Sequence, residues 1–176
     1  MYHGEEGRMT MLKDMLKSAK VVQYGDFTLS SGKKSNYYVN VKRASADPKI
    51  LREMAKEISK HVKGERLAGM ALGAVPLVVA VALQTGQPYV IVRKDQKEHG
   101  TMDKIEGEVQ AGEVFLVIED VATTGASAMR VVEALRSKGG SAKKIVTVVD
   151  REEGAREFLQ QNGIEMISLF KAKELV

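Results

Sequence analysis

The sequence predicts a single domain of the α/β class, built on a mostly parallel central sheet flanked by helices. Short apolar runs rich in β-branched residues alternate with stretches of helical periodicity along most of the 176 residues. Polar or glycine-containing turns follow four of these runs. Because the carboxyl ends of parallel strands meet at one edge of a sheet, and ligands bind at that edge, the four turns predict one ligand site.

The composition is that of a soluble globular protein, with 44% hydrophobic and 28% charged residues. No apolar run is long enough for a membrane span, the first residues lack the apolar core of a signal peptide, and the absence of cysteine excludes disulfides and thiolate metal sites. We therefore expect a cytoplasmic protein without a membrane partner. The net charge of +4 suits an anionic small substrate, whereas 5% aromatic residues and no basic stripe argue against nucleic acid.

In the N-terminal half, hydrophobic periodicity and turn residues predict the elements in order. We expect helices over residues 9–19, 48–62 and 77–83, strand pieces broken by a turn over 21–29, and strands over 37–41, 67–72 and 88–92. Asp47 and Pro48 suit the start of the second helix, since an N-cap aspartate and a first-turn proline are common there. The polar segment 30–36 predicts a loop, which by itself would indicate a hairpin with a basic tip.

In the C-terminal half, the same signals continue the alternation of strands and helices. We expect strands over 105–109, 114–118, 144–149 and 164–169, and helices over 126–137 and 155–161. The first two strands flank a hairpin-like turn at 110–113. Gly139 and Gly140 suit the end of the helix that begins at residue 126.

The most informative stretch runs from Val114 to Ser127. Its apolar first part suits a strand buried on both faces, and two acids, Glu119 and Asp120, follow where the strand is expected to end. A small-residue turn then precedes a helix, and backbone N–H groups at such a turn make a phosphate site. The expected ligand-binding residues of this stretch are Val121, Ala122, Thr123, Thr124, Gly125, Ala126 and Ser127. The acids would repel phosphate, so they should face ribose hydroxyls, a metal ion or positive charge on a sugar ring; the plainer alternative is a solvated helix start.

Three further turns lie at predicted strand ends. Leu72, Gly73 and Ala74 open either a plain β–α connection or a second edge of the site. The charged segment 93–101 is either a solvated loop or a mobile lid that brings cations and one imidazole to a polyanion. The segment 150–154 is either an acidic helix start or part of the same rim.

The stretch from Glu119 to Ser127 closely resembles the phosphoribosyl-pyrophosphate (PRPP) signature of the type I phosphoribosyltransferases. Residues 27–38, 93–100 and 150–154 resemble the orotate branch of that family. The resemblance implies the type I phosphoribosyltransferase fold, with a small hood built from about residues 1–45 and from the C-terminal tail at 170–175. It also implies a homodimer in which the lid loop closes over the neighbouring subunit's site.

The same resemblance implies roles for individual residues. Glu119 and Asp120 would hold the ribose hydroxyls, the threonine-rich turn would hold the 5-phosphate, and the turn at Leu72, Gly73 and Ala74 would hold pyrophosphate. Mg²⁺, bound mainly through PRPP and with no assigned protein ligand, would help to neutralise the departing pyrophosphate. Further implied contacts are those of Arg93, Lys94, Lys97 and His99 with PRPP, and of Thr123 and Arg151 with orotate. The implied catalytic residues are Lys97, His99, Asp120 and Glu119. Whether His99 donates a proton or anchors the closed lid stays open.

The chain departs from the family pattern at two places. Ser30 stands where many relatives carry lysine, which leaves open whether Lys33 or Lys34 replaces it, and the pyrophosphate turn has no lysine. The resemblance implies an orotate phosphoribosyltransferase that converts orotate and PRPP to orotidine 5-monophosphate and pyrophosphate in pyrimidine (UMP) biosynthesis. The alternatives are a phosphoribosyltransferase for a purine or another base, and a PRPP-sensing regulator that binds nucleic acid.

Overall fold

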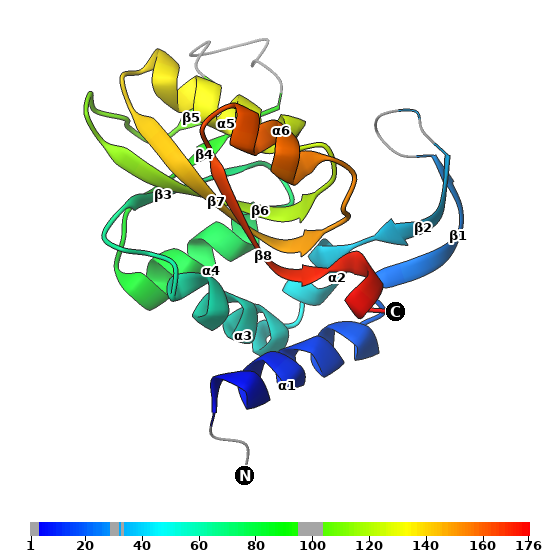
Figure 1. Cartoon of the computed structure of the whole chain (residues 1–176). Helices are drawn as coiled ribbons and strands as arrows, with labels where there is room; N and C mark the ends of the chain where they lie inside the picture. Colours follow the sequence, from blue (N-terminus) through cyan, green and yellow to red (C-terminus); the bar gives the residue numbers. More distant parts are fainter. Residues whose placement is uncertain (1–3, 29–31, 33, 95–103) are drawn as a thin grey trace.

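A six-stranded sheet forms the centre of the protein, with strand order β5-β4-β3-β6-β7-β8 (Figure 1). The structure is a computed structural model that describes residues 4–28, 32, 34–94 and 104–176. The strands are β3 (Arg66–Met70), β4 (Tyr89–Val92), β5 (Ile105–Glu106), β6 (Val114–Ala122), β7 (Ser141–Asp150) and β8 (Glu165–Lys171). All neighbouring pairs are parallel except β4 and β5, so the predicted mostly parallel sheet is confirmed.

Helices cover both faces of this sheet, as predicted. One face carries α3 (Pro48–Ser59) and α4 (Val75–Thr85), and the other carries α5 (Ala126–Ser137) and α6 (Ala155–Gln161) (Figure 1). Because side chains alternate along a strand, Leu116 of β6 joins the core beneath α3 and α4, whereas Val117 joins the core beneath α5 and α6. Within the described residues no helix has the length and apolar character needed to cross a membrane.

The N-terminal segment forms a smaller unit beside the sheet. It consists of α1 (Glu5–Ser18), β1 (Val22–Thr28), β2 (Lys34–Val39) and the short α2 (Val41–Ser45). The strands β1 and β2 make a separate antiparallel pair. Leu16 of α1 and Leu175, which follows the short 3₁₀ helix η1 (Ala172–Glu174), belong to one buried cluster. Figure 1 accordingly shows the C-terminal end next to α1 and the β1–β2 pair.

The predicted hairpin between residues 105–109 and 114–118 is wrong. Ile105 and Glu106 instead pair antiparallel with Val92 and Ile91 of β4, at the edge of the sheet, whereas β6 lies between β3 and β7. Residues 105–109 are a short mixed stretch with two acids and a glycine, and such a stretch does not show which neighbour a strand pairs with. The consequence is that the charged segment after β4 connects two adjacent strands.

Several element boundaries also differ from the prediction. The first helix begins at Glu5 instead of Met9, and β1 runs continuously, with a register shift after Tyr24 in place of a turn. Strand β2 begins at Lys34 and ends before α2, which was not predicted. Strand β6 continues through both acids to Ala122, because its last residues pair with β7. The predicted bounds of α5 and α6 are confirmed.

Candidate active site

A cavity of about 700 Å³ lies at the carboxyl ends of β3, β6 and β7, closed on one side by the β1–β2 pair. The structure brings most of the predicted site residues to its wall: Gly73, Lys94, Glu119, Asp120, Val121, Ala122, Thr123, Thr124, Gly125, Ala126, Ser127 and Arg151. These residues come from four separate parts of the chain. The sheet therefore gathers the predicted turns at one edge, as the parallel strand order requires.

The turn after β6 has the construction of a phosphate site. Helix α5 begins at Ala126, and its N-cap, Gly125, has a φ of 82°. Because the first residues of α5 line the cavity, the N–H groups of its first turn lie at the cavity wall. No acidic residue lies in that first turn to compete for the positive end of the helix. A Cβ at Gly125 would also approach the Phe158 side chain to 3.1 Å, so glycine fits this turn on two grounds. Thr124 and Ser127 are exposed on the same turn.

The acidic pair is divided between a buried and an accessible position. The Glu119 side chain is only 6% exposed, and its Oε2 atom has no hydrogen-bond partner among the described residues. Burial, and then the neighbouring Asp120 carboxylate, hold the pKa of Glu119 well above its ordinary value, so the protonated form is favoured. Asp120 is half-buried at the cavity wall. The two acids thus differ in burial, and Asp120 is the more accessible of the two.

The turn after β3 lies directly against Asp120. A Cβ placed on Gly73 would collide with the Asp120 carboxylate, so only glycine allows this approach. Of the other two residues predicted for this turn, Leu72 is 75% exposed and Ala74 is fully buried in the core beneath α4, and neither lines the cavity. The peptide bond between Ala71 and Leu72 is cis.

We expect Gly73→Ala to lower kcat/KM by about 100-fold, because the new methyl group would displace the Asp120 carboxylate by about 1 Å. Steady-state kinetics with both substrates would measure this effect. Gly4→Ala is the matched control, since Gly4 has a φ of −95° and the described residues place no atom within 4 Å of the added Cβ. Equal activities of the two variants would contradict the assignment of Asp120 to the reaction.

Arg151 is held on three sides, although it is a charged residue with a side chain only 3% exposed. Its backbone N–H donates to the Ala122 carbonyl at 2.9 Å, and its Nε donates to Glu153 Oε1 at 2.9 Å. Its Nη2 donates to Ser35 Oγ of β2 at 3.1 Å, and its guanidinium lies 4.4 Å from the centre of the Tyr37 ring. These contacts fix a cation at the junction of β7 and the β1–β2 pair, facing the cavity.

The predicted cationic residues are only partly brought together. Lys94 is exposed at the cavity wall, whereas Arg93 pairs with Glu106 of β5 at 3.3 Å and lines a neighbouring hollow of about 750 Å³. Lys34 donates to Thr28 Oγ1 at 2.8 Å, at the edge of the cavity. Lys97 and His99 lie outside the described residues, as do Ser30 and Lys33.

Sequence reasoning missed other cavity residues. Lys42 belongs to α2, a five-residue helix that no periodicity indicated. Arg130 follows Ala126 by one turn of α5, so the predicted bounds of that helix could have placed it on the cavity side. Tyr38 comes from β2. Arg130 and Lys42 add two cations to a cavity that also contains Lys94 and Arg151, which favours a polyanionic ligand.

An open α/β sheet with a phosphate turn, an accessible carboxylate and clustered cations defines a protein that acts on a phosphorylated sugar. Residues 39–162 match the family model of the phosphoribosyl transferase domain. That match spans more than half of the chain. It includes all the residues that line the cavity among those described, except Thr28 and Tyr38.

Individual relatives narrow the class. The chain is 48% identical to the orotate phosphoribosyltransferase of Picrophilus torridus, over 94% of this chain and 99% of the relative, and 50% identical to that of Natronomonas pharaonis, over 94% and 95%. The crystal structure of Mycobacterium tuberculosis orotate phosphoribosyltransferase in complex with PRPP has a TM-score of 0.77 and 31% identity, over 96% of this chain and 98% of that one. The chain belongs to the orotate phosphoribosyltransferase family.

Proposed function

We propose that this protein transfers the 5-phosphoribosyl group of PRPP to orotate, releasing pyrophosphate and forming orotidine 5-monophosphate for pyrimidine (UMP) biosynthesis. The observation that carries the proposal is that one cavity joins the phosphate turn at Thr123–Ser127, the accessible Asp120 and the anchored Arg151. PRPP needs the first two features, and an aromatic carboxylate needs the third. The Mycobacterium tuberculosis relative, whose fold this chain shares, binds PRPP.

The phosphate turn and the acids would bind different parts of the phosphorylated sugar. The N–H groups and hydroxyls of Thr123–Ser127 bind the 5-phosphate, and Asp120 accepts hydrogen bonds from the ribose hydroxyls. As the bond from the sugar to pyrophosphate loosens, positive charge grows on the ring, and the nearby Asp120 carboxylate stabilises it. Glu119 also lines the cavity, and its Oε2 atom has no hydrogen-bond partner among the described residues, so a ribose hydroxyl would supply that hydrogen bond.

Arg151 would orient the base. A guanidinium can bind the orotate carboxylate through two parallel hydrogen bonds, a geometry that lysine cannot reproduce. Ser35 and Tyr37 keep Arg151 beside the β1–β2 pair, which would act as the hood over the base. Thr123 is the second proposed orotate contact. The C-terminal tail, which shares a buried cluster with α1, would complete the hood.

Mg²⁺ is the proposed metal, bound mainly through PRPP. The described residues contain no group of three or more His, Asp or Glu side chains that could hold a metal, whereas Asp120 offers carboxylate oxygens next to the phosphate turn. This donor set fits Mg²⁺, which usually takes one or two carboxylates together with substrate phosphates. When bound, the ion would neutralise charge on the departing pyrophosphate. Lys94, Arg130 and Lys42 lie where they could share that task.

We further propose a cytoplasmic homodimer in which residues 93–101 close over the neighbouring site. Leu72 and Leu83, in the turn and helix after β3, are 75% and 84% exposed and would be available for a contact between subunits. Arg93 turns away from its own cavity toward Glu106, which supports a role for this segment elsewhere. The solution mass and cell fractionation would test these two points.

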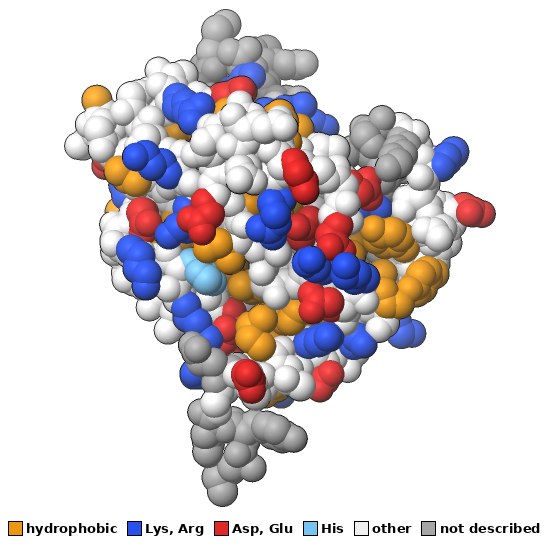
Figure 2. Space-filling model, viewed as in Figure 1, with side chains coloured by type: hydrophobic (Ala, Val, Ile, Leu, Met, Phe, Trp, Pro, Cys, Tyr) orange, Lys and Arg blue, Asp and Glu red, His pale blue; other side chains and the backbone are white. Residues whose placement is uncertain are grey.

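Orotate consumption, followed by its ultraviolet absorbance with PRPP and Mg²⁺ present, tests the proposed reaction. Loss of orotate matched by release of pyrophosphate, and no loss without PRPP, is the expected result. Turnover with adenine or uracil in place of orotate would move the assignment to another base. PRPP-dependent thermal stabilisation without turnover, together with salt-sensitive binding of RNA or DNA, would favour the regulator. Basic and acidic side chains are interspersed on the face shown in Figure 2, which does not favour that alternative.

A further inference from the structure

The loop that carries Arg151 has an unusual backbone at the next residue. Glu152 has a φ of 57°, in the left-handed region that residues other than glycine rarely adopt. Its backbone N–H donates to Asp150 Oδ1 at 2.8 Å, which holds the loop in this turn. A loop with such a conformation needs surrounding contacts that keep it in place.

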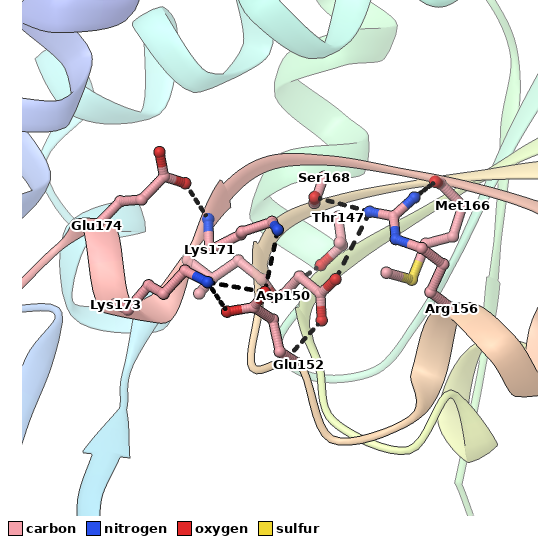
Figure 3. A network of polar contacts seen from close by, with 10 residues as sticks. Thr147, Asp150, Glu152, Arg156, Met166, Ser168, Lys171, Lys173 and Glu174 are labelled. Carbon is pink, nitrogen blue, oxygen red and sulfur yellow. Dashed lines mark hydrogen bonds and ion pairs between the residues drawn. The ribbon is translucent and has the colours of Figure 1, made fainter.

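Those contacts come from the C-terminal end of the chain (Figure 3). The Glu152 carboxylate pairs with Lys171 Nζ, at the end of β8, and with Lys173 Nζ of η1, each at 3.0 Å. Both lysines lower the pKa of Glu152, so the carboxylate stays ionised in their presence. One carboxylate on the Arg151 loop is therefore held by two cations from a segment about 20 residues later.

The lysines are themselves positioned. The backbone N–H of Lys171 donates to Glu174 Oε2 at 2.7 Å, which fixes the start of η1. Leu175 is buried in the core shared with α1, so the tail is anchored independently of Glu152. On the other side of the loop, Arg156 approaches Asp150 at 3.6 Å and donates to the Met166 carbonyl at 2.6 Å (Figure 3). Strand β8 and its tail thus brace both ends of the loop.

We infer that Glu152, clamped by Lys171 and Lys173, is a positioning residue that keeps Arg151 in its orotate-binding orientation. The inference rests on the proposed function, because it needs orotate as the ligand of Arg151. Exposed ion pairs contribute little to overall stability. They can still decide the conformation of a single loop, and the loss of the clamp would release the turn that presents Arg151. The expected signature is weaker orotate binding in a protein that remains folded.

The double variant Lys171→Ala/Lys173→Ala tests this inference. We expect the KM for orotate to rise by about five-fold to tenfold, from two surface ion pairs, while the KM for PRPP and the melting temperature stay close to the wild-type values. High salt should raise the KM for orotate by a larger factor in the wild type than in the double variant, because the variant has already lost the two ion pairs. The conservative double variant Lys171→Arg/Lys173→Arg should restore the wild-type KM. Lys143→Ala, an exposed lysine near the start of β7, is the control.

Glu152→Gln and Glu152→Gly distinguish the effect of the Glu152 charge from the effect of the strained backbone at this position. Both variants remove the ion pairs, but glycine accepts the positive φ without strain. Both should raise the KM for orotate if the clamp acts through charge. An unchanged KM in both, or equal rises in the KM for orotate and for PRPP, would overturn the inference. Failure of the proposed function is a different result, because the wild-type protein itself would then fail to consume orotate.

Discussion

Glu119→Gln should make the ligand-free protein more stable near neutral pH and yet lower kcat by about 100-fold. Glu119 is buried beside Asp120, and one of its oxygens has no partner in the part of the chain that the structure describes, so its ionised form is unfavourable in the folded protein. Glutamine keeps the shape of the side chain without the charge. The loss of turnover follows because positive charge on the sugar would favour ionisation of Glu119 in the transition state, and glutamine cannot ionise.

The raised pKa of Glu119 determines how the stability difference between Glu119→Gln and the wild type changes with pH. An acid whose pKa is higher in the folded protein than its ordinary value near 4.5 binds more protons when folded. Stability is therefore lost as the pH rises from that ordinary value through the raised one. Thermal melts should show the gap between Glu119→Gln and wild type widening above about pH 4.5 and closing below it. Glu165→Gln, an exposed control on β8, should show no such gap. A variant that is less stable at every pH would contradict the assigned charge state.

Lys97→Ala should lower kcat by about 100-fold to 1000-fold and change orotate binding much less, because Lys97 is proposed to contact the departing pyrophosphate only as its charge develops. Separate measurement of kcat and of orotate affinity checks this. Lys143→Ala, a charge loss far along the same sheet, is the control. A normal kcat for Lys97→Ala would remove the segment after β4 from the reaction.

Mixing two inactive variants tests whether that segment acts across a dimer. Lys97→Ala has an intact acidic pair, and Asp120→Asn has an intact lid segment. If the lid serves the neighbouring site, a mixed dimer has one complete site, so an equal mixture after subunit exchange should recover about a quarter of the wild-type activity. Recovery of none, from variants shown to exchange subunits, would place the lid over its own site.

The position of the site could be predicted because its main parts are local in sequence. The strand, acids, turn and helix of residues 114–137 follow one another directly, and each has its own composition. The charge state of Glu119 could not be predicted in the same way. It depends on β6 continuing past Ile118 and pairing with β7, which places the carboxylate in the core.

Contacts between distant segments account for most of what was missed. Arg151 was predicted as an orotate contact, but its hydrogen bond to Ser35, 116 residues away, was not, because resemblance of the two segments to the same family does not specify which side chains meet. The pairing of β5 with β4 was missed because residues 105–109, with two acids and a glycine between Ile105 and Val109, carry no signal that selects a neighbouring strand. Arg93 was assigned to PRPP from its motif, whereas its pairing with Glu106 depends on that same edge strand.

The pairing of β5 with β4 has one further consequence, for the length of the segment between them. The N–H of Arg93 donates to the Lys104 carbonyl at 2.8 Å, so the two ends of the connection are joined. The cost of closing such a loop grows only with the logarithm of its length, and each doubling costs about 0.6 kcal/mol. Insertions between these two residues can therefore change how the segment reaches a substrate while leaving the sheet almost as stable as before. The connection between Arg93 and Lys104 can thus vary in length independently of the fold that carries it.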